Sequence, residues 1–464
     1  MDNKPNIKEE LESILSGKGK GERGSKRVEF MEGLIGKAII LILFACCVVA
    51  MSYVFVGFKD LHYYVHSFLS ISIAYFLGKM ILSFFYRPVK GEAEEGLKVS
   101  VVIPSFNEDP DAVVKSILAL LKQDYPIHEI IFVDDGSKND AAYYRVLNLK
   151  HLLDAYREAS PSKSSLYKSL PSKHVPNLIV HKFEENKGKR HAQVWGFRQA
   201  TGDYFMLYDS DSQIYKDTLT ELLKPFRNKK ISSVVGHINV QNRDTNILTR
   251  LQDVIYQSAF RVGRAAQSVT GSVLVCSGAL AVHKKEYIID TLDEFLTMKV
   301  FGIGIKNGDD RVLTLMALRN GGKTKYQSTA ICLTNVPTKL NVYFKQQVRW
   351  CKSFYLHTIK SLKYAWKRPF MLMWLVCEGS MWILFGLGKI FTIYENPDIP
   401  LTVILVRSFV YLIIAALTHG IYYVFRHPIL FLAVPIFSIM HMFILMPVRL
   451  WALITIKKTA WGTR

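Results

Sequence analysis

The sequence predicts an α/β domain, built on a parallel and doubly wound sheet, within a protein of α-helical transmembrane segments. Two observations carry this prediction. Between residues 97 and 338, strand-like segments such as KVSVVIP and HEIIFVDD alternate with helical segments, and this order is typical of a sheet that binds ligands at the carboxyl ends of its strands. On both sides lie apolar runs, such as residues 38–58, that are long enough to cross a bilayer.

Residues 1–36 form a polar leader, and its basic segment GKGKGERGSKR favours the cytoplasmic side of a membrane. Within the leader, IKEELESIL is either a short amphipathic helix or part of a disordered tail. Residues 37–87 predict two transmembrane helices, at about 38–58 and 62–86. These helices return the chain to the cytoplasm, where the basic residues Arg87 and Lys90 are expected.

The predicted cytoplasmic domain, residues 97–338, contains four strands with helices between them. The segment DPDAVVKSILALLKQ begins a helix, with Asp109 as the N-cap and Pro110 in the first turn. The strand-like segments NLIVHKF and DYFMLYDSD flank a helix that begins near Gly188. Between the second and third strands, ASPSKSSLYKSLPSK (residues 159–173) is typical of a surface insertion.

The C-terminal part of the chain returns to the membrane. Residues 339–367 predict interfacial helices that carry KQQVRWCKSF, and residues 369–456 predict transmembrane or interfacial helices. Spans are expected at about 369–393 and 401–424, because the link YENPDIP has acidic residues and no basic ones, as an outside loop would. Residues 428–456 predict a re-entrant or interfacial pair, or two short spans, because the basic tail 457–464 belongs in the cytoplasm. We therefore expect a multi-pass protein of the plasma membrane with four spans, or six.

Composition narrows the classes of partner. The net charge of +20 suits the cytoplasmic face of a membrane protein or a site for phosphate-bearing ligands. No basic helix or aromatic–basic interleaving accompanies this charge, so a nucleic-acid partner is not expected. The six cysteines show no CxxC and no paired spacing, which favours free, reduced thiols.

Acidic and polar side chains gather at predicted strand ends, in IPSFNE, FVDDGS, YDSD and GDDR. Carboxylates at one edge of a sheet repel one another unless a cation binds there. Residues i and i+2 of a strand point to the same face, so Asp209 and Asp211 can share Mg²⁺ or Mn²⁺, which would neutralise a leaving diphosphate. Lys187, Lys189 and Arg190 stand near a helix N-terminus and suit phosphate oxygens. A single DxD or DDG is common in surface loops; the succession of four clusters favours a nucleotide site.

Longer stretches carry a resemblance to a known family. They are VDDGS, ENKGKRHAQ, YDSDS, NRDTNILTRLQDVIY, AAQSVTGSVLVCSGAL, GDDRVLT, YQSTAICLTNVP, QQVRWCKSF and WGTR, and they lie within residues 98–464. On these stretches the chain resembles the processive family 2 glycosyltransferases and, among them, the hyaluronan synthases of the bacterial type. The DxD and QxxRW elements are shared with cellulose and chitin synthases, whereas the stretch from NRDTN to SGAL and the WGTR end are more particular.

The resemblance implies a GT-A type sugar-nucleotide fold and roles for matching positions. Asp310 would be the base that deprotonates the acceptor hydroxyl, so that attack on an α-linked donor gives a β-link. Asp211, helped by Asp209, would hold the metal. The residues implied at the UDP donor are Asn107, Glu108, Asp134, Asp135, Lys187, Lys189, Asp209, Gln346, Gln347 and Arg349. The residues implied at the acceptor are Cys276, Ser277, Gly278, Asp309 and Trp350, with Trp461 and Arg464 of the tail folding back as a gate.

The resulting prediction is a synthase that joins N-acetylglucosamine and glucuronic acid from their UDP donors and extrudes hyaluronan, with UDP-sugars, the growing polysaccharide and membrane lipids as partners. The nearest alternative is a chitin or poly-N-acetylglucosamine synthase, which would use UDP-N-acetylglucosamine alone. A basic contact for the glucuronate carboxylate would separate the two, and Arg250, Arg261 and Arg264 are candidates, although helix-surface arginines are common. A further alternative is a carbohydrate channel that has lost catalysis. Such a protein would have lost the base or the metal ligands, and the sequence retains both. Another alternative is a transferase that adds one sugar to a lipid carrier. Such enzymes need not keep QxxRW, so the presence of this motif argues against it.

Overall fold

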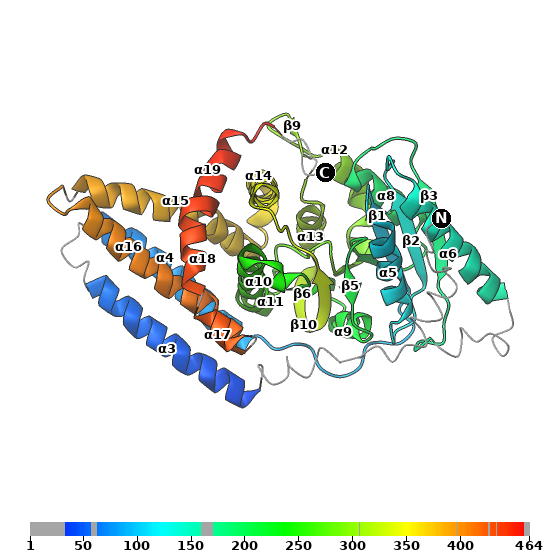
Figure 1. Ribbon diagram of the computed structural model, residues 1–464, viewed down its shortest axis with the longest axis horizontal. Helices are drawn as coiled ribbons and strands as arrows, with labels where there is room; N and C mark the ends of the chain where they lie inside the picture. Colours follow the sequence, from blue (N-terminus) through cyan, green and yellow to red (C-terminus); the bar gives the residue numbers. More distant parts are fainter. Residues whose placement is uncertain are drawn as a thin grey trace.

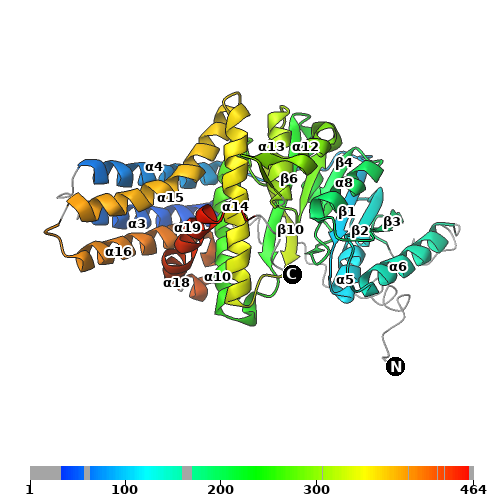
Figure 2. The same cartoon turned by 90° about the horizontal axis from the view of Figure 1, so that it is seen from above.

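A computed structural model describes residues 33–56, 63–158, 170–305, 307–395, 397–425, 427–432 and 434–458. The predictions for the leader helix, for residues 159–169 of the insertion, and for Trp461 and Arg464 lie outside these residues. Within the described residues, an α/β domain and a bundle of long helices lie at opposite ends of the molecule (Figure 1). Helix α14 (Leu340–Ala365) stands between them, as Figure 2 shows from above.

The α/β domain contains a mixed sheet with the strand order β3-β2-β1-β4-β7-β6-β10-β5. The strands of this sheet are β1 (Val99–Ser105), β2 (Glu129–Asp134), β3 (Asn177–Lys182), β4 (Tyr204–Leu207), β5 (Gln213–Ile214), β6 (Ile231–Val240), β7 (Ala281–Lys284) and β10 (Lys323–Thr334). The first four are parallel, as predicted. However, β7 is antiparallel to β4 and β6, and β5 is antiparallel to β10, so the prediction of a wholly parallel sheet is wrong. With four and two residues, β7 and β5 are too short to show a hydrophobic pattern.

Helices pack around this sheet, and the helices that follow Asp109 and Gly188 begin where the sequence predicted. The main ones are α5 (Pro110–Leu121), α6 (Ala141–Glu158), α8 (Lys189–Gln199), α9 (Thr218–Leu223), α12 (Leu292–Thr297) and α13 (Asp309–Arg319). The predicted N-cap is confirmed, because the Asp109 carboxylate accepts a hydrogen bond from Ala112 N at 2.9 Å. At Gly196 a Cβ atom would lie 2.6 Å from Cγ1 of Val102. Glycine therefore lets α8 lie close against β1, which brings the start of α8 to the carboxyl ends of the parallel strands.

Apolar helices make up the other end of the molecule. They are α3 (Leu34–Val56), α4 (Tyr63–Phe85), α15 (Pro369–Glu395), α16 (Leu401–His419), α17 (Pro428–Phe431), α18 (Val434–Met440) and α19 (Met446–Ile454). Among the described residues, Pro369–Gly388 and Leu401–Thr418 are long and apolar enough to cross a membrane. The pair Pro428–Ile436 and His441–Ile454, bent by 43°, is either a broken third span or a re-entrant loop. The total number of spans remains a prediction.

Three consecutive helical segments connect the domain to the apolar helices: α10 (Ile247–Ser258), the π-helical η3 (Ala259–Arg264) and α11 (Ala265–Val269). Gly263 lies against α4, since a Cβ atom there would stand 3.7 Å from Cε of Lys79. A π-helical turn holds an extra residue and so changes which side chains share a face of the helix.

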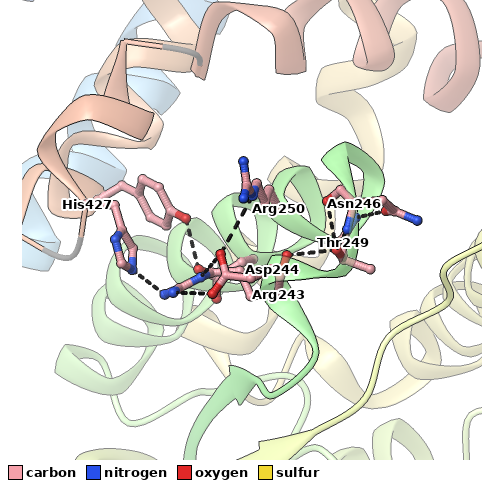
Figure 3. A network of polar contacts seen from close by, with 8 residues as sticks. Arg243, Asp244, Asn246, Thr249, Arg250 and His427 are labelled. Carbon is pink, nitrogen blue, oxygen red and sulfur yellow. Dashed lines mark hydrogen bonds and ion pairs between the residues drawn. The ribbon is translucent and has the colours of Figure 1, made fainter.

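A polar network holds the start of α10 against the C-terminal helices (Figure 3). Arg243 contacts the His427 ring and pairs with Asp244 at 2.7 Å. Close by, the Tyr423 hydroxyl donates a hydrogen bond to the buried carboxylate of Asp253 at 3.0 Å. These contacts join the chain that follows β6 to the segment that follows α16, although the two are far apart in the sequence.

Candidate active site

Polar residues follow the carboxyl ends of β1 and β2. Asn107 adopts a φ of 52°, a left-handed conformation that asparagine tolerates better than most residues. Its N–H donates to Ser137 Oγ at 2.8 Å, and its side-chain oxygen accepts from Lys138 N at 3.0 Å. Asn107 therefore links the loop after β1 to the loop after β2, with the half-buried Glu108 beside it.

Asp134 and Asp135 close β2 and have different environments. Asp134 is fully buried; its Oδ1 accepts from Ser137 N at 2.7 Å, and its Oδ2 has no hydrogen-bond partner among the described residues. Such an oxygen is available to a ligand. Asp135 instead accepts from the N–H groups of Lys187 and Gly188, both at 2.9 Å. Burial raises the pKa of Asp135, and these hydrogen bonds oppose the rise. Its carboxylate therefore holds the loop before α8, and its contact with a donor stays a prediction.

Lys189, in the first turn of α8, joins two of the acidic clusters. Its Nζ lies 2.7 Å from Asp209 Oδ1 and 3.7 Å from Asp309 Oδ2. Burial alone would lower the pKa of Lys189, but the two carboxylates outweigh it and hold the pKa above its usual value. Gln193, one helical turn further along, donates to Asp309 Oδ2 at 2.7 Å. The predicted convergence of the second acidic pair and the GDDR segment is therefore present, with Lys189 between them.

Asp209 and Asp211 follow β4 in a turn, because β4 ends at Leu207 and Ser212 N donates to the Asp209 carbonyl at 3.1 Å. The expectation that they share a strand face is wrong. Burial, and then the charge of Asp209, raises the pKa of Asp211 to about 6. No group of three metal-binding side chains occurs among the described residues. Two carboxylates in a turn still suit Mg²⁺ or Mn²⁺, which commonly combine one or two carboxylates with substrate phosphates.

Asp309 and Asp310 form the first turn of α13. The prediction that they follow the end of a strand of the main sheet is therefore wrong. Burial would raise the pKa of Asp309, but Lys189 and Gln193 reverse this and lower it. Burial and then the charge of Asp309 raise the pKa of Asp310 to about 6. Two adjacent carboxyl groups with pKa values pushed apart are an arrangement suited to proton transfer.

The CSG segment lies directly beside these carboxylates. At Gly278 a Cβ atom would stand 3.8 Å from both Asp309 Oδ2 and Lys189 Nζ, so this position borders the acidic centre. Cys276 is fully buried, and burial raises the pKa of its thiol to about 12. Its N–H donates to Thr314 Oγ1 at 2.9 Å, and that hydroxyl donates to the Asp310 carbonyl at 2.7 Å. Thr314, which the sequence analysis overlooked, thus ties the segment of Cys276 and Ser277 to the start of α13.

The QxxRW residues lie in the first half of α14. Gln346, Gln347 and Arg349 are half-buried, whereas Trp350 is 43% exposed. Burial lowers the pKa of Arg349 and the charges of Asp309 and Asp310 oppose this, so the guanidinium acts on the same acidic centre. The Trp350 indole, in the same part of α14, is exposed to solvent.

Comparisons with known proteins identify the family. The model of the glycosyl transferase family 2 domain matches residues 100–292. The hyaluronan synthase of Streptococcus pyogenes serotype M1 is 41% identical over 397 residues, which cover 85% of this chain and 89% of that protein. The chain belongs to glycosyltransferase family 2. The N-acetylglucosaminyltransferase of Azorhizobium caulinodans is 31% identical, over 79% of this glycosyltransferase and 87% of that protein.

A solved structure supports the predicted GT-A type fold of this glycosyltransferase. The mannosyltransferase PcManGT of Pyrobaculum calidifontis, solved with GDP-mannose and Mn²⁺, superimposes with a TM-score of 0.54. The alignment covers 88% of this chain and 99% of that one at 17% identity, so the likeness concerns the fold alone.

Two basic residues at the start of α8 have partners that the sequence did not reveal, and the diphosphate contact of Lys187 stays a prediction. The Lys187 ammonium lies 5.3 Å from the centre of the Phe183 ring. Arg190 is buried and donates to the carbonyls of Phe295 at 3.0 Å and Asn307 at 2.7 Å, so the expectation that it binds phosphate is wrong. The pattern KGKR predicted a cationic helix start, but it did not reveal that its three cations have three different sets of partners.

Tyr256 is a further residue at the acidic centre that the sequence analysis missed. Burial raises the pKa of its phenol, and the charges of Asp209 and Asp211 raise it further. Arg264, eight residues later, acts on Asp310 by its charge. On a straight α-helix two such positions diverge by about 80°, and the π-helical η3 between them changes this angle. The irregular helix was not visible in the sequence.

Proposed function

We propose that this protein is a membrane-bound, processive and inverting glycosyltransferase that polymerises UDP-N-acetylglucosamine and UDP-glucuronate into hyaluronan and extrudes the chain through its own helices. The observation that carries the proposal is the convergence of Asp209, Lys189 and Asp309 at the carboxyl edge of the sheet, beside Asp310. The 41% identity to a hyaluronan synthase over most of both chains supports the product. The apolar helices beside the site support a route across the membrane.

In this proposal Asp310 is the general base. A base near neutrality can take a proton at physiological pH and release it afterwards, and the pKa of about 6 that burial gives Asp310 suits this task. The acceptor hydroxyl loses its proton to Asp310 as its oxygen attacks the anomeric carbon, and the UDP diphosphate leaves from the opposite face. The exposed Trp350 stacks on the acceptor sugar, and Gly278 leaves room for it beside the carboxylates.

The UDP donor lies across the ends of β1, β2 and β4. Asp134 offers its unpaired Oδ2 to the nucleoside, and Arg349 suits bidentate contact with the diphosphate. Asp211 and Asp209 would hold Mg²⁺ or Mn²⁺, which supplies positive charge to the leaving diphosphate. The Mn²⁺ of the structurally similar mannosyltransferase supports a divalent ion in this fold.

The second candidate product is a polymer of N-acetylglucosamine, which the relative named N-acetylglucosaminyltransferase favours. Glucuronate differs by a carboxylate, so a cation near the sugar that is transferred distinguishes the two. Arg250 pairs with Asp244 at 3.6 Å (Figure 3), and Arg261 donates to Gln257 at 3.2 Å. Only Arg264 of the three candidates acts on the base by its charge. We therefore assign recognition of the glucuronate carboxylate to Arg264.

The decisive experiment supplies purified membranes, with Mg²⁺ or Mn²⁺, with each UDP-sugar alone and with both. Polymer that forms only with both donors and is digested by hyaluronidase is the expected result. If UDP-N-acetylglucosamine alone gives a polymer that chitinase digests, the product is a polymer of N-acetylglucosamine and not hyaluronan. In the Arg264→Met variant we expect the KM for UDP-glucuronate to rise about tenfold or more, as for the loss of a charged hydrogen bond, with little change for UDP-N-acetylglucosamine. An equal rise for both donors would contradict the assignment.

A further inference from the structure

One backbone carbonyl next to the proposed base receives hydrogen bonds from two distant helices. The Asn307 carbonyl accepts from the Arg190 guanidinium of α8 at 2.7 Å and from His357 Nε2 of α14 at 3.0 Å. Asn307, Arg190 and His357 are all buried. The carbonyl lies three residues before Asp310, so its position determines where α13 begins.

The residue after this carbonyl is pressed against α14. Gly308 has a φ of 71°, and a Cβ atom there would lie 1.8 Å from Ser353 Oγ and 3.1 Å from His357 Nε2. No side chain fits, and the left-handed backbone favours glycine as well. On the other side of Asp310, the Arg311 guanidinium lies 4.7 Å from the centre of the Phe354 ring of α14. One helix therefore grips the chain both before and after the base.

The chemistry of the two donors is well defined. A carbonyl oxygen only accepts, so His357 Nε2 must carry the hydrogen. Burial, and then the charge of Arg190, lowers the pKa of His357 to about 3, which keeps the ring neutral. Arg190 donates to Phe295 and Asn307 carbonyls through its two terminal nitrogens and lies 4.8 Å from the Phe295 ring. The residue before it, Lys189, pairs with Asp209. Neighbouring residues of α8 thus hold the acidic centre and the Asn307 carbonyl.

We propose that Arg190 and His357 are positioning residues that fix the Asn307 carbonyl. They thereby hold Asp310 where its carboxylate reaches the acceptor hydroxyl. We call these three residues the Asn307 clamp. The proposal rests on the assigned role of Asp310 as base. The Arg190 and His357 side chains act on the rate through the placement of the α13 N-terminus and not through contact with substrate. A displacement of about 1 Å at a reacting group can cost about 100-fold in rate.

The test compares His357→Gln with His357→Asn in the full-length protein. The glutamine amide can place its nitrogen where His357 Nε2 lies, whereas the asparagine amide is one methylene shorter and cannot reach the carbonyl. We expect His357→Gln to keep kcat within about threefold of the wild type, and His357→Asn to lose about 10- to 100-fold. The KM for both UDP-sugars should change less than about twofold, because the donor contacts are intact. Arg190→Met should show the same loss of kcat, since it removes both donors of the guanidinium.

The matched control is His283→Asn. His283 is also fully buried, has a pKa lowered to about 3 by burial, and makes one hydrogen bond, to Ser233 Oγ at 2.8 Å. A purely structural effect would lower the thermal stability of both asparagine variants while kcat per folded molecule stayed constant. Equal kcat in His357→Gln and His357→Asn would overturn the clamp. If Asp310→Asn kept its activity, the base assignment would fall instead, so the two failures are distinguishable.

Discussion

Lys189 offers the most quantitative test of the site, because it is the cation between two acidic clusters. At an effective dielectric constant of about 20, Coulomb's law gives about 6 kcal/mol for a pair at 2.7 Å and about 4.5 kcal/mol at 3.7 Å. Desolvation offsets much of this, and removing one partner of a buried pair costs about 3–5 kcal/mol. The Lys189 side chain is 25% exposed. We therefore expect Lys189→Met to lose about 3 kcal/mol, which lowers the Tm of a domain of this size by roughly 6–12 °C.

The loss should also depend on pH. Without Lys189, Asp309 loses the cation that holds its pKa low, and burial then raises that pKa above the unfolded value of about 3.9. The folded variant binds a proton that the unfolded chain has released, so its stability falls as the pH rises through the raised pKa. Thermal unfolding of detergent-purified protein should therefore show the largest deficit at pH 8 and a smaller one at pH 5.

Two variants control this experiment. Arg198→Met removes another cation of α8, whose pair with Asp293 at 2.6 Å is exposed, so we expect less than about 1 kcal/mol. The double variant Lys189→Met with Asp309→Asn removes the cation and one of its two carboxylate partners, so it should regain part of the lost stability while Asp209 stays without its partner. A Tm loss in Lys189→Met that matches Arg198→Met, or that does not vary with pH, would refute the reasoning.

The remaining predictions concern the carboxylates. Asp310→Asn should lower transfer by about 10²–10⁴-fold while UDP affinity, measured by calorimetry, stays within about twofold; lost UDP binding would instead indicate a nucleotide-site role. In the wild type, kcat should fall as the pH drops through about 6, because protonated Asp310 cannot accept the acceptor proton, and a flat pH–rate profile from 5 to 8 would contradict this. Asp211→Asn should raise the Mn²⁺ concentration needed for half-maximal activity about tenfold or more, and lowering the pH through about 6 should weaken wild-type metal binding as Asp211 protonates.

Short patterns in the sequence predicted correctly the features that depend on residues close together in the chain. Asp109 caps its helix, α8 begins after Gly188, and Asp134 ends β2, because each depends on neighbours in the chain. Contacts between distant segments were not predictable in this way. The sequence did not show that the oxygens of Asp135 accept hydrogen bonds from the loop before α8. Likewise GDDR looked like a strand end, but its carboxylates begin a helix whose place depends on α14.

Helix α14 places the QQVRW segment between the α/β domain and the apolar helices. In the proposed function its first half carries Arg349 and Trp350, which contact donor and acceptor, and about two turns later His357 donates a hydrogen bond to the chain before the base. The same helix reaches the C-terminal apolar segment, where Tyr355 donates to the Arg449 carbonyl at 3.3 Å. Hydrogen bonds join each turn of a continuous helix to the next, so the helix moves as one unit. In the proposed function, the donor contact, the acceptor contact and the base therefore keep their spacing through each cycle, as a processive mechanism requires, because its product stays bound between additions.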